Sequence, residues 1–338
     1  MTEYLRDSWY CIGWSSQLEE KPIGITVCGT YIVAYRGADG SIIAMDGRCP
    51  HRFAPMKLGS VNGDTIACPY HGLVFDRDGT CILNPHGGGA IPPNATLKAY
   101  PAVEHLGAIW VWLGTAEHAD RSKLPMLEWW GSSDYAVSTG YLRVEAHYQL
   151  VMDNLLDLTH GPYLHADTLG GDPANTVGVG MRHEWDTQPG PVLHSNYFVE
   201  NMPSPSPQIM ALVGDIPGRL QARMRWRPAS ILDLDLRYSP AGGGADAHIP
   251  SVHYLAPESD NSTHYFFALA RNVDITNETL TEMLAAQVHK AFAEEDEPMI
   301  KACQSLMGTS DLMSMKPAIL QTDAAAIQAR RLLKKEMA

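Results

Sequence analysis

Two short motifs near the N-terminus, each with one cysteine and one histidine, constrain the fold of this chain most. Cys49 and His51 form C-x-H, and after a further sixteen residues Cys68 and His71 form C-x-x-H. Thiolates and imidazoles together bind zinc, or an iron–sulfur cluster in which histidines replace two cysteines on one iron. The chain must therefore fold so that two separate loops meet and present four ligands to one site.

The residues around these motifs favour short β-strands joined by turns. Apolar, β-branched and aromatic side chains are concentrated at 23–27, 31–35, 41–45, 65–67, 73–75, 80–83 and 103–113. Both ligand pairs fall between these strands, where a rigid sheet can hold the loops that carry them. Since the segment 114–123 is polar and poor in core-forming residues, we predict an all-β domain at 1–118 and a second domain at 119–338.

Length, charge and composition exclude several other classes of protein. The 338 residues, 45% of them hydrophobic, suit about two folded domains. The 25 basic residues are outnumbered by 38 acidic ones, which argues against nucleic-acid binding. No apolar run reaches the length of a membrane span, and the N-terminus does not resemble a signal peptide. We expect a cytoplasmic protein that is not bound to a membrane, whose six cysteines are reduced.

The second domain mixes strand-like and helical segments. Strand character occurs at 141–146, 191–200, 208–213, 219–226, 230–238, 249–255 and 263–271, and helical character occurs at 147–160, 277–306 and 323–338. Turns that contain Pro or Gly separate the strands. We therefore predict a meandering antiparallel sheet wrapped around a helix, an arrangement that can enclose a substrate cavity.

A second set of possible metal ligands lies on the helix predicted at 147–160. Asn154, Asp157 and His160 share one polar stripe of a mostly apolar segment, and the stripe could simply be hydrogen-bonded or solvent-facing. His165 follows five residues after His160, about 140° away on a continuous helix, so the two could not share a metal there. Because Gly161 and Pro162 interrupt the helix, His165 can return to a position beside His160.

The helix predicted at 277–306 offers a carboxylate to complete this set. Asp296 falls between Phe292 and Ile300 on the apolar side of the helix, and the neighbouring Glu295 is the alternative. Two histidines and one carboxylate form the facial triad of non-heme iron oxygenases, which leaves coordination positions open.

Together these features resemble the oxygenase component of the Rieske non-heme iron oxygenases. The resemblance covers the whole chain and rests on CPHRFAP, CPYHGL, NPHGGGA, HYFF, EEDEPMI and the pattern N-x-x-D-x-x-H-x4-H at 154–165. These motifs are similar to the subgroup with vanillate O-demethylase, dicamba O-demethylase and toluenesulfonate methyl-monooxygenase. The resemblance implies an α+β protein, with an N-terminal Rieske [2Fe–2S] domain and a catalytic domain of the helix-grip, START-like type.

The resemblance also implies roles for the first ligand set. Cys49 and Cys68 would hold the inner iron of the cluster, and His51 and His71 would hold the iron nearer to solvent.

In the second set, His160, His165 and Asp296 would hold the mononuclear iron. Asp157 would link a Rieske histidine of one subunit to an iron-binding histidine of the next, which implies a homotrimer. Asn154 would lie beside the iron.

For the substrate, the resemblance points to His253, and Arg237 or Trp226 could also line the pocket. The implied reaction uses dioxygen and electrons from NAD(P)H, delivered by a separate reductase that carries flavin or a plant-type ferredoxin cluster. The reaction would hydroxylate a small aromatic acid, with O-demethylation of a methoxylated benzoate as the leading hypothesis. Hydroxylation of an aryl methyl group or ring, for example of an aryl sulfonate, is the alternative. From other classes, an electron-transfer Rieske protein without oxygenase activity and a structural zinc protein remain open.

Overall fold

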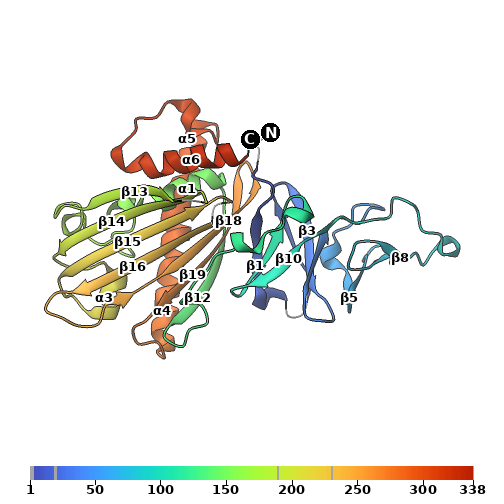
Figure 1. Ribbon diagram of the computed structural model, residues 1–338, viewed down its shortest axis with the longest axis horizontal. Coiled ribbons are helices and arrows are strands. Elements are labelled where there is room, and N and C mark those ends of the chain that lie inside the picture. Colours follow the sequence, from blue (N-terminus) through green and yellow to red (C-terminus); the bar gives the residue numbers. More distant parts are fainter. Residues whose placement is uncertain (1–3, 19–20, 189, 230, 338) are drawn as a thin grey trace. The chain divides into compact units, whose positions relative to one another are not determined.

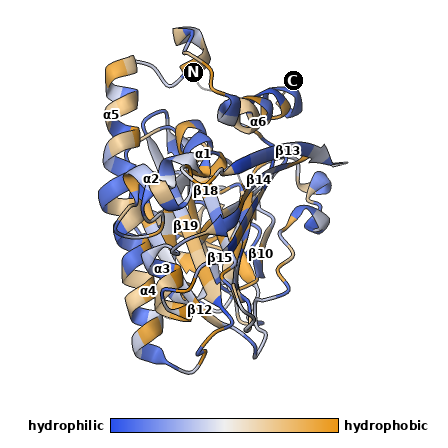
Figure 2. Cartoon of the chain, turned by 90° about the vertical axis from the view of Figure 1, so that its left-hand side faces the viewer, coloured by the Kyte–Doolittle hydropathy of each residue, from blue (hydrophilic) through white to orange (hydrophobic). Residues whose placement is uncertain are grey.

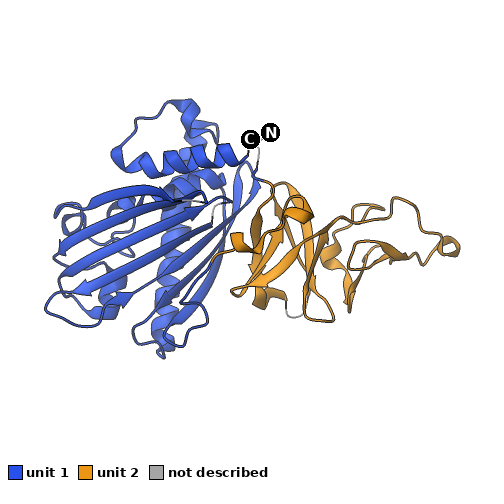
Figure 3. Cartoon of the chain, viewed as in Figure 1, with its two compact units in different colours: residues 1–5, 126–338 blue, residues 6–125 orange. Residues whose placement is uncertain are grey.

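The computed structural model describes residues 4–18, 21–188, 190–229 and 231–337. The chain divides into two compact units: residues 6–125 form one, and residues 4–5 with the described residues from 126 onward form the other (Figure 3). The polar segment after residue 113 stays with the first unit because Trp9 Nε1 donates to the Asp120 carbonyl at 2.8 Å and His105 Nε2 donates to the Pro125 carbonyl at 2.7 Å. The domain limits 1–118 and 119–338 remain a prediction.

The N-terminal unit consists of small antiparallel sheets (Figure 1). The first sheet, in the order β1-β11-β10, comprises Trp9–Trp14, Ala108–Trp112 and Ala102–His105. The second, β2-β3-β4-β9, comprises Ile23–Val27, Thr30–Arg36, Ile42–Asp46 and Ala99–Tyr100. The third, β5-β6-β7-β8, comprises Ser60–Asn62, Thr65–Ala67, Val74–Phe75 and Cys81–Leu83.

One strand prediction in this unit was wrong. The segment 103–113 is a hairpin rather than a single strand, because the chain reverses at Leu106 and Gly107. Both residues have positive φ angles, 49° and 65°, as the tight turns between antiparallel strands require.

The C-terminal unit is built on one large antiparallel sheet with the order β12-β19-β18-β16-β15-β14-β13 and with β17 beside β16. In chain order from β12 to β19 these strands are Ala136–Val144, Arg182–Gln188, Val192–Met202, Gly218–Arg227, Ile231–Pro240, Ala247–His248, Ser251–Ser259 and Ser262–Arg271. The helices α1 to α6 are Tyr148–Leu156, Gly161–Leu164, Pro207–Val213, Glu278–Lys290, Glu297–Met307 and Ala324–Glu336. A π-helical turn, Ala291–Asp296, joins α4 to α5.

Strand alternation gives the sheet an apolar face and a charged face. In β15 the even-numbered residues Leu220, Ala222 and Met224 line a cavity, whereas Arg223 and Arg225 point to the other side. Helix α4 lies along the apolar face (Figure 2), and α4 and the π-helical turn that follows it line the same cavity. The edge strand β13 is hydrophilic along its length (Figure 2).

The segment predicted as a strand at 208–213 is instead helix α3. Pro207 occupies the first turn, where its missing N–H costs nothing, and Gly214 follows the helix with a φ of 76°. Between them stand Gln, Ile, Met, Ala, Leu and Val, of which all but Ile and Val are good helix formers. None of the helices in the described part of the chain has both the length and the apolar composition that a membrane span requires.

Candidate metal centres and the adjoining cavity

The two cysteine loops of the N-terminal unit have the same backbone pattern. The amide of Cys49 donates to the carbonyl of Ala54, five residues on, and the carbonyl of Cys49 accepts from Phe53, four residues on. Cys68 makes the same two bonds, with Leu73 and with Gly72. Phe53 and Gly72 both have positive φ angles, of 57° and 70°. The site is therefore built from one loop geometry used twice.

These loops separate the thiols from the imidazoles. Cys49 and Cys68 are 1% and 3% exposed and belong to the apolar core. His51 is exposed, His71 is half-buried, and the centroids of their rings lie 4.5 Å apart. An inner pair of sulfur donors and an outer pair of nitrogen donors fits a Rieske cluster, in which each pair holds one iron.

The thiol of Cys49 needs nearby positive charge in order to ionise. Burial raises the pKa of Cys49 to about 11, and contact with Cys68 adds to the rise against backbone amides that lower it. Coordination to metal removes the proton from such a thiol. The local electrostatics therefore fit a bound cluster.

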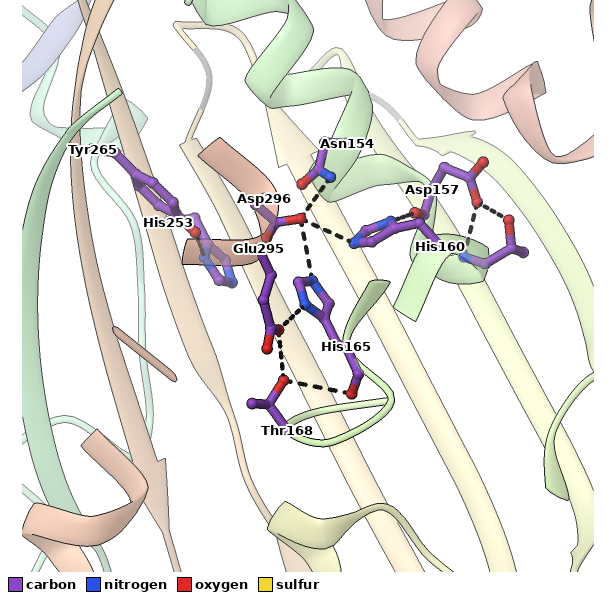
Figure 4. Close-up of polar contacts among 10 residues, drawn as sticks. Asn154, Asp157, His160, His165, Thr168, His253, Tyr265, Glu295 and Asp296 are labelled. Carbon is purple, nitrogen blue, oxygen red and sulfur yellow. Dashed lines mark hydrogen bonds and ion pairs between the residues drawn. The ribbon is translucent and has the colours of Figure 1, made fainter. Parts of the chain in front are cut away.

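A second constellation lies in the C-terminal unit, where one ligand atom from each of His160, His165 and Asp296 lies within 4.8 Å of the others. The Oδ1 atom of Asp296 is 3.1 Å from His165 Nε2 and 3.5 Å from His160 Nε2 (Figure 4). Such a convergence of two imidazoles and a carboxylate suits a divalent iron.

The segment from Leu156 to His165 differs from the helix predicted at 147–160. Helix α1 ends at Leu156, because the Asp157 carboxylate accepts hydrogen bonds from the amide and the hydroxyl of Thr159 at 2.9 and 2.5 Å. These bonds cap a short 3-10 turn, Leu158–His160, and Pro162 then lies in the first turn of α2. The break that brings the histidines together thus begins earlier than Gly161 and Pro162.

The π-helical turn settles the geometry of the two neighbouring acids. Asp296 faces Nε2 of His165, whereas Glu295 Oε2 accepts a hydrogen bond from Nδ1 of the same ring at 2.7 Å. Thr168 Oγ1 donates to the same Glu295 oxygen at 2.8 Å. Asp296 therefore belongs to the constellation, and Glu295 orients one of its histidines. π-turns often occur at functional sites.

Hydrogen bonds fix the orientation of both imidazoles. His160 Nδ1 donates to the Asp157 carbonyl at 2.5 Å, as His165 Nδ1 does to Glu295, so both rings turn Nε2 toward Asp296. Asn154 Nδ2 donates to Asp296 Oδ1 at 2.9 Å. Burial lowers the pKa of His160, although Asp296 opposes this effect, and the neutral imidazole is the form that binds metal. Burial also lowers the pKa of His165, but contacts with Asp296 and Glu295 outweigh it and raise the pKa overall.

A cavity of about 160 Å³ adjoins these three residues, between the sheet and α4. Its walls are mostly apolar, with Leu220, Met224, Leu234, Leu236, Val288 and Phe292 among them. Polar side chains beyond the metal set include Thr176, Gln208, Ser251 and His253.

The structure separates the three residues predicted to bind substrate. His253 lines the cavity, with Nδ1 2.6 Å from the Tyr265 hydroxyl (Figure 4) and Nε2 3.0 Å from Ser251 Oγ. Arg237 does not line it: Leu236 faces the cavity, so Arg237 points to the other side of β16, where it donates to Asp235 at 2.9 Å. Trp226 is fully buried but does not reach the cavity.

Sequence reasoning missed several residues that support this site. Tyr197 donates to the carbonyl of Leu156 at 3.0 Å, Ser195 donates to the same carbonyl at 2.9 Å, and the His183 ring stacks on Tyr197. Gln208 was also missed as a residue of the cavity lining, because its segment was predicted to be a strand. These contacts join distant parts of the chain, and no local pattern marks them.

A Rieske-type ligand set in one unit, with a two-histidine, one-carboxylate site beside a cavity in the other, defines the oxygenase component of a Rieske non-heme iron oxygenase. The Rieske [2Fe–2S] domain family matches residues 8–101, and the vanillate O-demethylase oxygenase C-terminal domain family matches residues 144–338. The chain belongs to this vanillate O-demethylase family of Rieske oxygenases. The predicted fold, the resemblance and the two iron cofactors are confirmed.

Individual relatives cover nearly the whole chain. A putative toluene-4-sulfonate monooxygenase system iron-sulfur subunit of Comamonas testosteroni is 33% identical over 97% of this chain and 96% of its own. The oxygenase component of chloroacetanilide N-alkylformylase of Rhizorhabdus wittichii is 32% identical over 99% and 96%. The crystal structure of dicamba monooxygenase bound to 3,6-dichlorosalicylic acid superposes with a TM-score of 0.91, at 30% identity over 99% of this chain and 98% of that one.

Proposed function

We propose that this chain is the terminal oxygenase component of a system that hydroxylates an alkyl group on a small aromatic molecule. Oxidative O-demethylation is the leading reaction, and hydroxylation of an aryl methyl group or ring is the alternative. One observation carries the proposal: a largely apolar cavity adjoins His160, His165 and Asp296, so a bound aromatic ring would lie against the metal site.

Two bound groups would supply the redox chemistry. Cys49, Cys68, His51 and His71 would hold the [2Fe–2S] cluster, and the triad of the C-terminal unit would hold the mononuclear iron. When bound, these groups provide electrons and activate dioxygen.

The side chains around the metal site position the substrate and keep water out. Asn154 and Glu295 hold Asp296 and His165 by hydrogen bonds, and the three residues that would hold the iron all line the cavity. The apolar walls orient the ring and exclude water that would divert the reaction. With an aryl methyl ether, two electrons, two protons and dioxygen give water and a hemiacetal. The hemiacetal then divides into a phenol and formaldehyde.

Asp157 is proposed to connect two subunits of a homotrimer. Its backbone carbonyl accepts from His160, and Thr159 holds its Oδ1. No described residue donates a hydrogen bond to Oδ2, so this atom is available to a Rieske histidine of a neighbouring subunit. Electrons would pass from that histidine through Asp157 to His160.

The proposed partners are a separate NAD(P)H-dependent reductase, with flavin or a plant-type ferredoxin cluster, and an aromatic substrate. The name "oxygenase component" of the Rhizorhabdus wittichii relative and the name "system iron-sulfur subunit" of the Comamonas testosteroni relative support a multicomponent system. A cytoplasmic location is part of the proposal.

The test uses the purified protein with a surrogate reductase, NADH and a panel of methoxy- and methyl-substituted aromatics. We expect substrate-dependent oxygen uptake with formaldehyde release from a methoxy compound. His160→Ala and His165→Ala should abolish both while the visible spectrum of the cluster persists. Turnover that survives either substitution would show that these histidines do not hold a catalytic iron. A coloured protein that shows no substrate-dependent oxygen uptake would indicate an electron-transfer protein, and a colourless protein would indicate zinc.

A further inference from the structure

We propose that Arg330, on the C-terminal helix α6, is a positioning residue for the mononuclear iron site and acts on that site through helix α1. The inference rests on the proposed function, because it concerns the same iron, but iron binding tests it without any need for turnover. It follows from two contacts that adjacent residues of α1 make in different directions.

The guanidinium group of Arg330 holds α1 over one full turn. Its Nε donates to both carboxylate oxygens of Asp153 at 3.0 Å, and its Nη2 donates to Oδ2 at 2.6 Å. Its Nη1 donates to Oε1 of Gln149, four residues earlier on the same helix, at 2.7 Å. The side chains of Arg330 and Asp153 are only 10% and 17% exposed. A planar group bonded to two positions of one helix restricts the rotation of that helix about its axis.

The next residue of α1 reaches the iron site. Asn154 Nδ2 donates to Oδ1 of Asp296 at 2.9 Å (Figure 4), and this is the oxygen that faces the Nε2 atoms of both histidines. Because a helix rotates as one body, a rotation of α1 that displaced Asp153 would also displace Asn154 from Asp296. The contact with Arg330 on one side of α1 therefore sets the contact with Asp296 on another.

The far end of α1 has an anchor of its own. The carbonyl of Leu156 accepts hydrogen bonds from the hydroxyls of Tyr197 and Ser195, at 3.0 and 2.9 Å. Since α1 is nine residues long, its position is set by its contacts with other elements rather than by its own stability. Arg330 thus governs the turn that carries Asn154, whereas β14 holds the segment that follows the helix.

The attachment of α6 does not need this ion pair. Ala325, Ala329 and Leu333 are fully buried and recur every four residues, so they give α6 an apolar stripe. A buried ion pair adds little net stability over apolar packing, because both charges lose their hydration. Its bidentate geometry, however, fixes a direction. Orientation of α1 is therefore a role that Arg330 and Asp153 can fill and the apolar stripe cannot.

The test is titration of the apoprotein with ferrous iron under anaerobic conditions. Removal of Arg330 alone would leave the Asp153 carboxylate buried without a partner, which destabilises the fold. The main variant therefore replaces both partners, as Arg330→Met with Asp153→Leu, and should unfold at nearly the wild-type urea concentration. We expect its iron affinity to fall about tenfold or more, because Asn154 is no longer held against Asp296, while the visible spectrum of the cluster stays unchanged.

Arg330→Lys is a second variant, which keeps both charges. A lysine lacks the fork that bonds to Asp153 and Gln149 together, so iron affinity should fall several-fold. Wild-type affinity in either variant overturns the inference. Leu333→Ala is the control: it weakens the packing of α6 without touching the ion pair, and should lower stability but not iron affinity. An equal loss of iron affinity in Leu333→Ala would show that α6 acts only by its attachment, and would also overturn the inference.

A double-mutant cycle tests the route through Asn154. In an Asn154→Ala background, the paired changes at Arg330 and Asp153 should lower iron affinity much less than in the wild type, because the contact they position is already absent. Effects that add fully overturn the inference. If iron affinity depends on Arg330 but no aromatic is oxidised, the proposed function fails and the inference stands. If aromatics are oxidised and iron affinity does not depend on Arg330, the reverse holds.

Discussion

Glu295 Oε2 accepts a hydrogen bond from His165 Nδ1 at 2.7 Å, although the residue that follows it in the sequence faces the opposite nitrogen of the same ring. The imidazole is thus held between two consecutive carboxylates, one for orientation and one that faces the metal position. An ordinary α-helical turn separates the directions of neighbouring side chains by about 100°, and the π-helical turn here lets both reach one ring.

This relationship predicts different results for neighbouring acidic residues. Glu295→Ala should lower iron affinity by roughly 10- to 100-fold, because the His165 ring loses the acceptor that orients it, and Glu295→Gln should restore part of that affinity. Asp296→Asn should remove mononuclear iron almost completely. Iron titration of the apoprotein measures all three. The exposed Glu294→Gln variant is the control, and an iron content that depends on Glu295 but not on Asp296 would reverse the assignment.

Asp157 is expected to serve electron transfer without binding iron. Asp157→Asn should keep both metal centres, as metal analysis and the visible spectrum would show, yet lower turnover by roughly 10- to 100-fold, because a neutral amide replaces the carboxylate between subunits. Thr159→Val, which removes only the hydroxyl bonded to Asp157 Oδ1, should have a smaller effect. Light scattering should give the mass of a trimer. Unchanged turnover in Asp157→Asn would exclude the bridging role.

The loop after His165 depends on a close approach between two glycines. A Cβ atom on Gly170 would lie 2.0 Å from the carbonyl oxygen of Gly161, whereas a Cβ atom on Gly161 would come no closer than 3.9 Å to Gly170. Gly170→Ala should therefore lower the free energy of unfolding by roughly 1–3 kcal/mol and displace the segment that carries His165. Gly161→Ala, although it is next to His160, should be tolerated. Denaturant unfolding and iron content, measured for both variants, check the prediction. Equal losses of stability in the two variants would contradict the close approach of Gly170 to the Gly161 carbonyl.

Acid should destabilise the C-terminal unit through buried histidines. Burial lowers the pKa of His147 from 6.5 to about 4, so below pH 6.5 the unfolded chain takes up a proton that the folded chain does not. The stabilisation is complete above pH 6.5 and falls by about 1.4 kcal/mol per pH unit as the pH drops toward 4. His147→Asn keeps a good N-cap for α1 but cannot titrate, and should make unfolding in urea less dependent on pH. An unchanged dependence on pH would show that His147 titrates normally.

Much of the site could be predicted from the sequence because its ligands lie in local patterns. Cys49, His51, Cys68 and His71 form two compact motifs, and Asp296 falls on the apolar side of a periodic helix. Residues that are close together in the sequence stay close together in the folded chain, so such motifs can be recognised without the structure. The alternation of apolar residues likewise predicted most strands of the large sheet, and turn residues predicted where they end.

The other parts of the site could not be predicted, because they depend on contacts between segments that are distant in the sequence. Glu295 meets His165 across 130 residues of sequence, and only the folded chain shows which nitrogen it binds. Arg237 was named as a residue that could line the pocket, but it faces the other side of β16. The side that a strand residue faces follows from the register, which composition does not give. Asp157 ends α1 through a side-chain cap, which competes with a helical pattern that continues past it.

The alternation along β15 and β16 places the cavity lining on one face of the sheet and a set of ion pairs on the other. Substitutions can therefore change one of these without the other. Substitutions at Leu220, Leu234 or Leu236 alter what the cavity accepts without touching the ion pair of Arg225 and Asp233 on the other face. An insertion of one residue, in contrast, would carry arginines inward and leucines outward at once. Point substitutions at every second position of these strands are therefore expected to change the cavity alone, whereas a one-residue change in register would change both faces together.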